Sequence, residues 1–565
     1  MKTNNAEPAS KAVVPEAGLA KGRIPLVIGI TGHRRLRPED RPALAEAVRG
    51  EYRRLKEQYP HSPLVLLDSL AEGADLLCAD AAEELGIPLI AVLPRELTEY
   101  ENDFSAEALP CLRHHAARAM QCFVAPFCET EQTGISRRDY EFRQAGIYVA
   151  THCHVLMALW DGEPGEDGGC GTAEAVDFVL HGNYSPLKGA PLRSETNEAV
   201  IHIYTPRGES AAEPPASLHY LGNREAVRDV LQKTEEFNRS ADTLPEKERP
   251  TLRGEDRREE RPDASAADRG GPDPVSERVH AVGRLAGTLS MRSARLYRRI
   301  LACLAVASAL LTFAFLMYDE AQSIWMILVC GVMIGLAFLL GRFAARSDCH
   351  RRYIEYRALA EVLRVQYYLR RAGSAVQAAD LLSWTQQEET AWILDALCAL
   401  SIGAPPLRAH DIRADWVDEQ RDYHRQAAVR SRSKLRVSEQ TVRIALGVSI
   451  TLYLAAVAFE LLCGGLIFEP CVTVADTEAY RTLLKILLGT ISAVTLFVAN
   501  YYGKLSLPRI LSDHGKMARF YSKMSALLQK HGQTDELLTV LAREELIENG
   551  NWVSYERDNT PDVSF

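Results

Sequence analysis

Glycine and small polar residues gather where three short apolar runs of this sequence end. Glycine lets a backbone approach a phosphate closely, and free N–H groups at the start of a helix attract anions. One such position usually marks only a tight turn, but three at one edge of a sheet indicate a nucleotide-binding site. The candidate ligand-binding residues are Gly29, Thr31, Gly32, His33, Arg34, Ser69, Glu72, Gly73, Asp75, Asp161, Gly162, Gly169, Gly171, Thr172 and Arg207. The last of these either closes the site as a cation or is a plain exposed arginine.

Six apolar runs must position these residues, and they alternate with segments of helical periodicity. The runs are Ile24–Ile30, Leu64–Leu67, Pro88–Leu93, Gln121–Ala125, Cys153–Trp160 and Ile201–Tyr204, and the clearest helices are Pro42–Tyr59, Asp75–Leu85 and Arg137–Ala150. This alternation predicts a parallel, doubly wound sheet, an α/β Rossmann-like fold. In such a sheet ligands bind beyond the carboxyl ends of the strands, where the candidate residues lie.

Four motifs in this region, ITGHRRL, SLAEGAD, ALWDG and GTAEAV, resemble in order and spacing the SLOG superfamily of Rossmann-like nucleotide-sensing domains. The resemblance covers residues 22–240 and implies that the domain binds a nucleotide or an NAD-derived signal. It also implies three groups of contacts: Gly32, His33 and Arg34 hold a phosphate-side edge, Glu72, Gly73 and Asp75 face the ribose or base, and Gly171 and Thr172 donate to a phosphate.

A related branch of that superfamily hydrolyses nucleotides and carries the pattern PGGxGTxxE. In this chain GGCGTAEA places Ala175 where the catalytic glutamate would lie, and Glu174 is one position early, about 100° round a helix. We therefore expect binding without catalysis and no cofactor beyond the nucleotide signal. The alternative is a membrane-tethered nucleotide phosphoribohydrolase or NADase-like enzyme. His152 and His154 would share one face of a strand but have no evident third partner, so we expect no metal.

The composition of the whole chain limits its partners and its compartment. The 565 residues carry a net charge of −10 at pH 7, and the pI is near 5.9. We expect no nucleic-acid partner, because nucleic-acid binders present basic surfaces. Twelve cysteines are scattered without a CxxC pair, which fits free thiols in a reducing compartment.

Two pairs of long apolar segments follow the α/β region. Residues 301–318 and 324–340 contain no charged side chain, and each is long enough to cross the ~30 Å hydrocarbon core of a bilayer. Residues 444–468 and 486–502 form the second pair. Arginine and lysine are concentrated before the first segment and after the second segment of each pair. The positive-inside rule therefore places these flanking residues in the cytoplasm. We expect four spans in two hairpins in the bacterial inner (plasma) membrane, with both termini cytoplasmic.

Glu460 is the one ionisable residue within the third apolar segment. Ionisable residues inside a span are costly to bury and are functional candidates by default, so Glu460 is a candidate for the mouth of a pore. It lies ~24 Å along the helix from Ile444, which is near the outer boundary of the hydrocarbon. The alternatives are that it reaches the outer headgroups or pairs with Lys485 across the hairpin.

The membrane half, about residues 280–545, resembles the two-helix SLATT membrane effectors that accompany SLOG sensors in bacterial conflict systems. The segments WVDEQRDYH and RALAEVLR carry that resemblance. It implies that ligand sensing triggers membrane permeabilisation by a homo-oligomer, here with four spans rather than two. SDCHRRYIEYRALAEVL and SDHGKMARFYSKMSALL are also weakly alike, which together with the order of elements indicates a degenerate internal repeat.

We therefore predict a pore-forming membrane effector of a bacterial conflict or antiphage system, with a small nucleotide ligand and the lipid bilayer as its partners. A membrane anchor for a partner complex is the alternative from the structural class. The predicted organisation is a disordered tail at 1–21, the SLOG-like domain at 22–240, a disordered charged linker at 241–275, membrane modules at 276–400 and 401–545, and a tail at 546–565.

Overall fold

The computed structural model describes residues 22–126, 136–163, 171–181, 199–207, 212–249, 273–321, 324–405, 409–462, 474–504 and 507–558. The expected tail at 1–21 and most of the expected linker lie outside the described residues. The chain divides into two compact units. Unit 1 comprises Met1–Leu289, Glu355–His410 and Leu538–Gly550, and unit 2 comprises Ser290–Ile354, Asp411–Leu537 and Asn551–Phe565.

Unit 1 contains a seven-stranded sheet whose first six strands are those expected from the sequence. The strands are β1 (Leu26–Gly32), β2 (Leu64–Asp68), β3 (Leu89–Leu93), β4 (Gln121–Val124), β5 (Val155–Trp160), β6 (Ala199–Tyr204) and β7 (Leu218–Gly222), in the order β4-β3-β2-β1-β5-β6-β7. All neighbours are parallel except β6 and β7. The α/β parallel sheet is thus confirmed for six strands, and an unpredicted antiparallel strand forms one edge.

Strand β1 lies at the centre of this sheet. It pairs with β2 on one side, Val27 opposite Val65, and with β5 on the other, Gly29 opposite Leu156. The chain proceeds outward from β1 to β4 and then starts again beside β1 at β5, so the strand order reverses between β1 and β5. The carboxyl ends of these two strands border the crevice in which such folds bind ligands.

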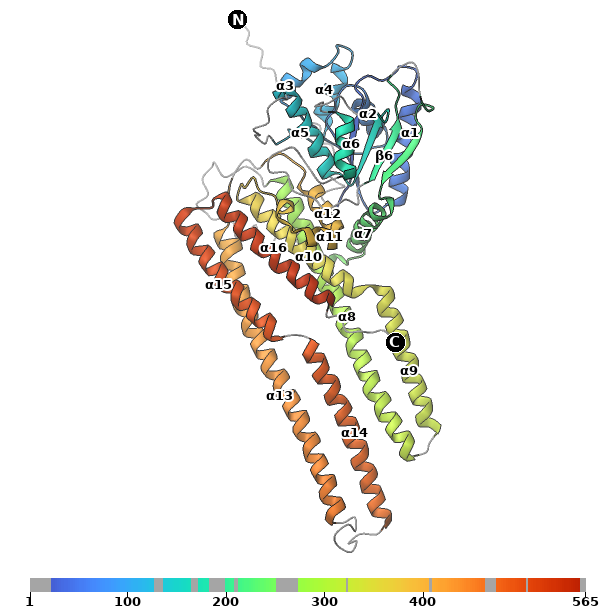
Figure 1. Ribbon diagram of the computed structural model, residues 1–565, viewed down its shortest axis with the longest axis vertical. Coiled ribbons are helices and arrows are strands. Elements are labelled where there is room, and N and C mark those ends of the chain that lie inside the picture. Colours follow the sequence, from blue (N-terminus) through green and yellow to red (C-terminus); the bar gives the residue numbers. More distant parts are fainter. Residues whose placement is uncertain are drawn as a thin grey trace. The chain divides into compact units, whose positions relative to one another are not determined.

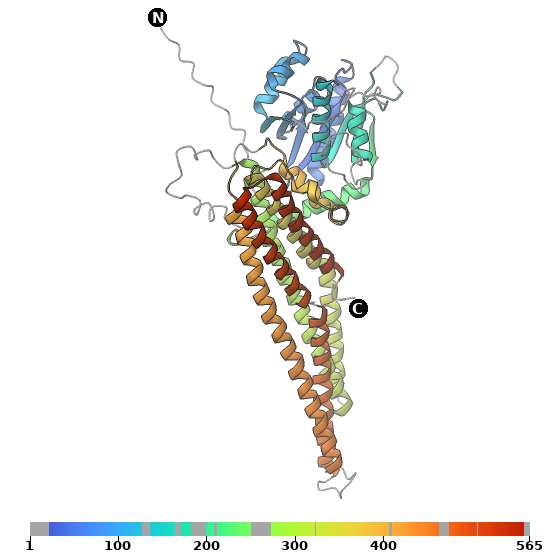
Figure 2. The ribbon, with the colours of Figure 1, turned by 60° about the vertical axis from the view of Figure 1, so that its left-hand side comes forward.

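Helices cover both faces of the sheet (Figures 1 and 2), as the continuously buried central strands require. The helices of the sheet domain are α1 (Arg41–Gln58), α2 (Ala74–Glu84), α3 (Leu97–Tyr100), the short η2 (Glu101–Asp103), α4 (Leu109–Arg118), α5 (Arg137–His152) and α6 (Thr172–His181). Ile28 and Leu66 face the layer of α1, α2 and α4, whereas Val27 and Leu67 face the layer of α5 and α6.

His152 and His154, whose spacing in the sequence is typical of metal ligands, lie on different elements. His152 is the last residue of α5, so the strand placement expected for it is wrong. His154 is buried, and its Nδ1 accepts a hydrogen bond from the N–H of Val27 at 3.1 Å. Burial lowers the pKa of His154 to about 4, so the ring is neutral near pH 7 and remains a structural acceptor.

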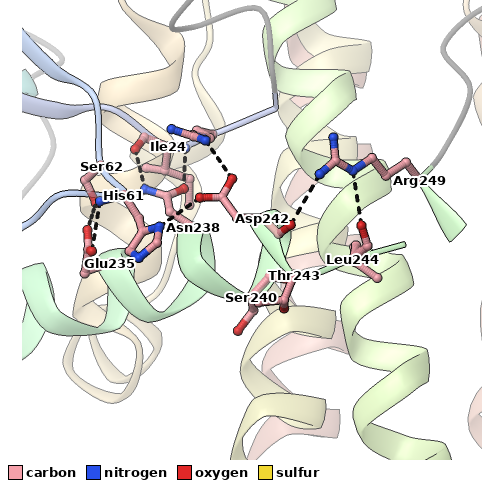
Figure 3. Close-up of polar contacts among 11 residues, drawn as sticks. Ile24, His61, Ser62, Glu235, Asn238, Ser240, Asp242, Thr243, Leu244 and Arg249 are labelled. Atoms are coloured by element: carbon pink, nitrogen blue, oxygen red, sulfur yellow. Dashed lines mark hydrogen bonds and ion pairs between the residues drawn. The ribbon is translucent and has the colours of Figure 1, made fainter. Parts of the chain in front are cut away.

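Helix α7 (Arg224–Asp242) fastens to the sheet domain through polar contacts near its C-terminal end (Figure 3). The side chain of Asn238 accepts from the N–H of Ile24 and donates to the carbonyl of the same residue, both at 2.9 Å. Glu235 accepts from the backbone N–H of His61 at 2.9 Å and from the hydroxyl of Ser62 at 2.7 Å. These bonds satisfy buried polar groups and fix α7 beside the start of β1.

Helices from later in the chain complete unit 1. They are the first part of α8 (Pro274–Ala321), the second part of α10 (Cys349–Arg371), η7 (Ala378–Leu381), α11 (Trp384–Glu389), α12 (Ala391–Ser401) and part of α16 (Asp535–Asp558). Ala399 and Ile402, at the end of α12, pack in the apolar layer between the sheet and α5. The backbone N–H of Gly403 donates to the hydroxyl of Tyr148 in α5 at 3.3 Å. The end of α12 therefore belongs to the core of the sheet domain.

Two arginines bond the end of α12 to other helices of unit 1. Arg278 of α8 donates to the carbonyl of Ile402 at 2.7 Å. Arg370 of α10 is buried, pairs with Asp273, and donates to the carbonyl of Ala404 at 2.6 Å. A displacement of the end of α12 would therefore change contacts of both α8 and α10.

The long apolar helices belong mainly to unit 2. Within the described residues, three helical stretches are long and apolar enough to cross a membrane, and they are Pro274–Tyr318, Ile324–Arg371 and Arg413–Leu461. Only 22%, 11% and 0% of the residues in their most apolar windows are buried. Helices of a soluble core would cover such windows, so these exposed apolar stretches indicate a membrane protein.

The first hairpin consists of α8 and α9 (Ile324–Ser347). Ile300 and Leu304 of α8 pack with Leu340 and Ala344 of α9. These residues lie at similar distances from the turn, so the two helices are antiparallel, as predicted. The chain leaves α9 through Asp348, whose φ of +50° interrupts the helix before α10 begins.

The second group of unit 2 begins with η8 (Arg413–Asp418) and continues with α13 (Glu419–Leu462), α14 (Val474–Lys504) and α15 (Leu507–His531). Helices α13 and α15 run side by side (Figure 2), with Nδ1 of His424 and Nδ1 of His514 3.0 Å apart. The expected fourth span, residues 486–502, lies within α14, and only some of its side chains are described. The number of spans therefore stays a prediction. Helix α16 extends into the segment expected to be a tail from residue 546.

Candidate functional site

Three of the predicted ligand residues meet at the crevice between β1 and β5. His33 follows β1, Asp161 follows β5 and Arg207 lies three residues beyond β6. Nε2 of His33 accepts from the backbone N–H of Asp161 and from Nε–H of Arg207, each at 3.1 Å. Nε of Arg207 also lies 2.9 Å from Oδ2 of Asp161. An imidazole, a carboxylate and a guanidinium are therefore in direct contact at the carboxyl ends of β1 and β5, where the strand order reverses.

The His33 ring is neutral in this arrangement. Two N–H donors point at Nε2, so the ring proton lies on Nδ1. Burial and the charge of Arg207 lower the pKa of His33 and together outweigh the opposing effect of Asp161, whose Oδ1 is 3.3 Å from Nε2. The side chain of Arg207 is 57% exposed, compared with 13% for Asp161, so the guanidinium is the accessible member of the group.

Two glycines allow the loops after β1 and β2 to touch. A Cβ at Gly73, where φ is +100°, would lie 2.3 Å from the carbonyl oxygen of Arg34 and 2.5 Å from that of His33. A Cβ at Gly32 would lie 2.4 Å from the Cβ of Ala74. The N–H of Ala74 donates to the carbonyl of His33 at 3.0 Å. Gly32 and Gly73 are therefore needed to position the loop that carries His33 and Arg34.

Asp75 lies buried against Asp68, although the resemblance implies that it faces the ribose or base. Oδ1 of Asp68 accepts from the N–H of Leu70 at 2.7 Å, and Oδ2 of Asp75 accepts from the N–H of Ala71 at 3.2 Å. Burial and the neighbouring carboxylate raise the pKa of Asp75 well above its ordinary value. A protonated Asp75 donates to Asp68, whose own pKa burial raises to about 6.

Two other predicted residues have clear structural contacts. Glu72 accepts from the backbone N–H and the hydroxyl of Ser105 at 3.1 and 2.7 Å, which ties the loop after β2 to the segment before α4. Gly29 lies inside β1, and a Cβ there would be 2.8 Å from both Sγ of Cys153 and Cγ1 of Val149. Its lack of a side chain makes room for α5 rather than for a ligand.

The remaining predicted residues lie at the ends of strands or at a helix start. Thr31 is in β1, and Ser69 follows β2. Gly162 follows β5 and has a φ of +84°, and Thr172 begins α6 directly after the exposed Gly171. Gly169 lies outside the described residues. The described candidate residues therefore lie along the carboxyl edge, and three of them, His33, Asp161 and Arg207, contact one another through their side chains.

A cluster of cations around Phe142 of α5 was not predicted from the sequence. The guanidinium carbons of Arg34, Arg95 and Arg138 lie 5.0, 5.7 and 5.4 Å from the centroid of its ring. Arg34 follows β1, Arg95 follows β3 and Arg138 lies in the first turn of α5, so all three stand at the carboxyl edge of the sheet. The available signals were a basic residue two positions after the Pro88–Leu93 run and the arginine pair that opens α5.

Two members of this arginine cluster already have carboxylate partners. Arg95 lies 2.8 Å from Glu141, and Arg138 lies 2.6 Å from Asp103. Arg34 is exposed on the face of Phe142, where a cation–π contact holds its charge in place. Arg34 and Arg207 are thus two exposed cations at this edge, and Arg207 is also paired with Asp161.

Glu174, the nearest substitute for a catalytic glutamate, is held by a buried arginine. Its two carboxylate oxygens lie 2.8 and 3.0 Å from Nε of Arg143. The pair links α6 to α5 and gives Glu174 a structural contact.

Glu460, the pore candidate, pairs across the second hairpin with Arg481 of α14. Nη2 of Arg481 lies 2.6 Å from one oxygen of Glu460, and Nε contacts the other. The described partner is thus one turn earlier in α14 than the expected Lys485. A two-point contact of this kind fixes the orientation of both side chains.

No protein-family model matches this chain, and no curated protein matches it. The resemblances to SLOG and SLATT proteins therefore stay predictions that rest on the motifs named above.

Proposed function

We propose that this chain is a membrane effector of a bacterial conflict or antiphage system. Its α/β domain binds a nucleotide or an NAD-derived signal on the cytoplasmic side, and its membrane helices then permeabilise the inner membrane as a homo-oligomer. The observation that carries the proposal is the contact among His33, Asp161 and Arg207 at the reversal of strand order. Nucleotides bind at this position in doubly wound sheets.

The chemistry of this edge suits a phosphorylated ribose. Arg207 and Arg34 supply exposed guanidinium groups, which bind phosphate with two parallel hydrogen bonds. An incoming phosphate would compete with Asp161 for Arg207 and free the carboxylate to accept from a ribose hydroxyl. His33 would stay neutral and keep the loop after β5 in place through the N–H of Asp161.

We infer that ligand binding is transmitted to the membrane helices through the end of α12. The start of α6 lies at the site, and α5 and α6 share an apolar layer with Ile402. Arg278 and Arg370 bond the end of α12 to α8 and α10. A ligand can shift this arrangement only if it binds one state more tightly than the other.

The hydrolase alternative ranks second, because the carboxylate of Glu174 is paired with Arg143 and Ala175 occupies the catalytic position of the motif. The anchor alternative predicts a membrane protein that does not respond to nucleotides. Measuring nucleotide or NAD turnover by the purified chain separates the hydrolase from the sensor, and measuring ligand-dependent permeability separates the sensor from the anchor.

The decisive experiment is a binding screen with the full chain in detergent or nanodiscs, since Ala399 and Ile402 complete the core of the sheet domain. Nucleotides, NAD and ADP-ribose are screened by thermal shift, and hits are titrated by calorimetry. Arg207→Gln should weaken binding by about 10- to 100-fold, the effect of one charge-assisted hydrogen bond. The matched control is Arg53→Gln on the outer surface of α1.

The second half of the test uses liposomes loaded with a fluorescent dye. The ligand found in the screen should release dye from vesicles that contain the wild-type chain or Arg53→Gln, but not at the same concentration from vesicles that contain Arg207→Gln. The proposal fails if no ligand of this class binds, or if binding and dye release are equal in Arg207→Gln and the control.

A further inference from the structure

Helices α2 and α4 place five side chains of metal-ligating type opposite one another, away from the crevice between β1 and β5. Asp80 and Glu83 are three residues apart on α2, so they share one face of that helix. Cys111, His114 and His115 have the spacings i, i+3 and i+4 on α4 and likewise share a face. The two faces meet, because both helices pack on the same side of the sheet.

Three of these side chains converge on one point. Oδ1 of Asp80 lies 2.7 Å from Nε2 of His115 and 3.6 Å from Sγ of Cys111, and the three ligand atoms all lie within 4.8 Å of one another. Around a tetrahedral zinc ion, oxygen, nitrogen and sulfur ligands are separated by about 3.3 to 3.6 Å. An ion therefore fits after side-chain shifts of roughly 1 Å or less, with Asp80 and His115 moving slightly apart.

The surroundings of His115 are those of a metal-binding histidine. Its side chain is 3% exposed, so the ring is fixed by packing. Nδ1, the nitrogen that faces away from Asp80, lies 3.8 Å from Oε2 of Glu83. The 3.8 Å separation is longer than a hydrogen bond, and a small movement of His115 away from Asp80 would bring Glu83 into the contact that orients a ligating imidazole and increases its basicity. Glu83 is in turn held by His114 at 2.9 Å and Arg118 at 2.8 Å.

We propose that Asp80, Cys111 and His115 form a binding site for a divalent transition metal of the zinc type, with Glu83 orienting His115 and a fourth coordination position open to solvent. Thiolate and imidazole ligands together select borderline-soft ions such as Zn²⁺ over Mg²⁺ or Ca²⁺. The bound ion would join α4 to α2, whose first turn follows the loop of Glu72 and Gly73. This site is independent of the nucleotide proposal.

The test uses the full chain in detergent, freed of metal with a chelator and titrated with Co²⁺, which reports its ligands through its absorption spectrum. One equivalent of Co²⁺ should produce a thiolate charge-transfer band and the visible bands of a tetrahedral ion. Cys111→Ser should abolish the charge-transfer band. Cys122→Ser is the matched control, since Cys122 is an exposed cysteine on β4, and it should leave the spectrum unchanged.

Competition with a zinc indicator then measures affinity. Glu83→Gln should keep the charge-transfer band and weaken Zn²⁺ binding by about 10- to 100-fold, the usual effect of removing a carboxylate that orients a histidine ligand. His115→Gln should abolish binding. Cys111→Ser, a conservative change at a partly exposed position, keeps the test decisive if His115→Gln does not fold. The proposal is overturned if Co²⁺ gives no charge-transfer band, or if the band survives in Cys111→Ser.

Discussion

Substituting Gly73 tests whether the contact between the loops after β1 and β2 holds the candidate site together. Gly73→Ala combines two costs. At φ +100° and ψ −111°, Gly73 lies outside the conformations that residues with a side chain ordinarily adopt, and holding an alanine there costs about 1–3 kcal/mol. The new Cβ also meets two backbone carbonyl oxygens at 2.3 and 2.5 Å, and relieving such overpacking costs a further 1–3 kcal/mol or so. We expect a loss of about 2–6 kcal/mol in the local stability of α2.

Gly86 provides the matched control at the other end of the same helix. Its φ is +64°, but a Cβ there would meet nothing within 4 Å. Gly86→Ala therefore carries only the conformational cost of about 1–2 kcal/mol. Both substitutions add a side chain at positive φ, and the excess loss in Gly73→Ala reports the close approach of the loops together with the rarer backbone conformation of Gly73.

Cys78 in α2 reports the local opening of this region, because it is fully buried. The full chain is exposed to a thiol reagent under native conditions, and labelling of the Cys78 peptide is followed by mass spectrometry. At tenfold per 1.4 kcal/mol, Gly73→Ala should speed labelling by roughly 30-fold or more, and Gly86→Ala by about 5- to 30-fold. Equal rates in the two variants would refute the argument that the loop contact stabilises the site.

Three further outcomes follow from the charges and the topology. Burial and a neighbouring carboxylate raise the pKa of Asp75, so folding takes up a proton that the unfolded chain releases near pH 4, and stability falls as the pH rises. Asp75→Asn should therefore flatten the pH dependence of local stability between about pH 4 and 8, measured as the Cys78 labelling rate divided by that of a free thiol at the same pH. Glu460→Arg and Arg481→Glu should each alter ion selectivity in bilayer recordings, and the double variant should restore it. A reporter fused at Pro405 should be active in the cytoplasm, and periplasmic activity there would exclude two complete hairpins.

The sequence predicts the six parallel strands and misses the antiparallel strand at one edge of the sheet. Strands β1 and β2 are continuous apolar runs, and each is found within two residues of its expected position. Strand β7, LHYLG, lies at the antiparallel edge with half-exposed side chains, so it has no such run. Helix α4 buries only Leu112, His115 and Ala116, which is too few for a clear helical period.

Within the site, the sequence predicts where the loops lie but not which way their side chains face. Asp75 opens a helix, the usual place for a residue that contacts a ligand, yet it turns inward because Asp68 and the N–H of Ala71 bind it there. The contact between Asp80 and His115 likewise could not be predicted from the sequence. The metal-ligating residues have a helical spacing on α2 and again on α4, but only the packing of α2 against α4 brings the two sets together.

The composition of unit 1 bears on the number of membrane crossings. Unit 1 is drawn from three stretches of the chain, and each gap between them, residues 290–354 and 411–537, contains one group of long helices. If unit 1 lies on one side of a membrane, each excursion must cross an even number of times before the chain returns. The first excursion does so with α8 and α9, whereas the second contains α13 as its only candidate span among the described residues. On that condition the return crossing would belong to α14, which contacts α13 through Glu460 and Arg481 and contains the apolar residues 486–502, and the fourth span stays a prediction.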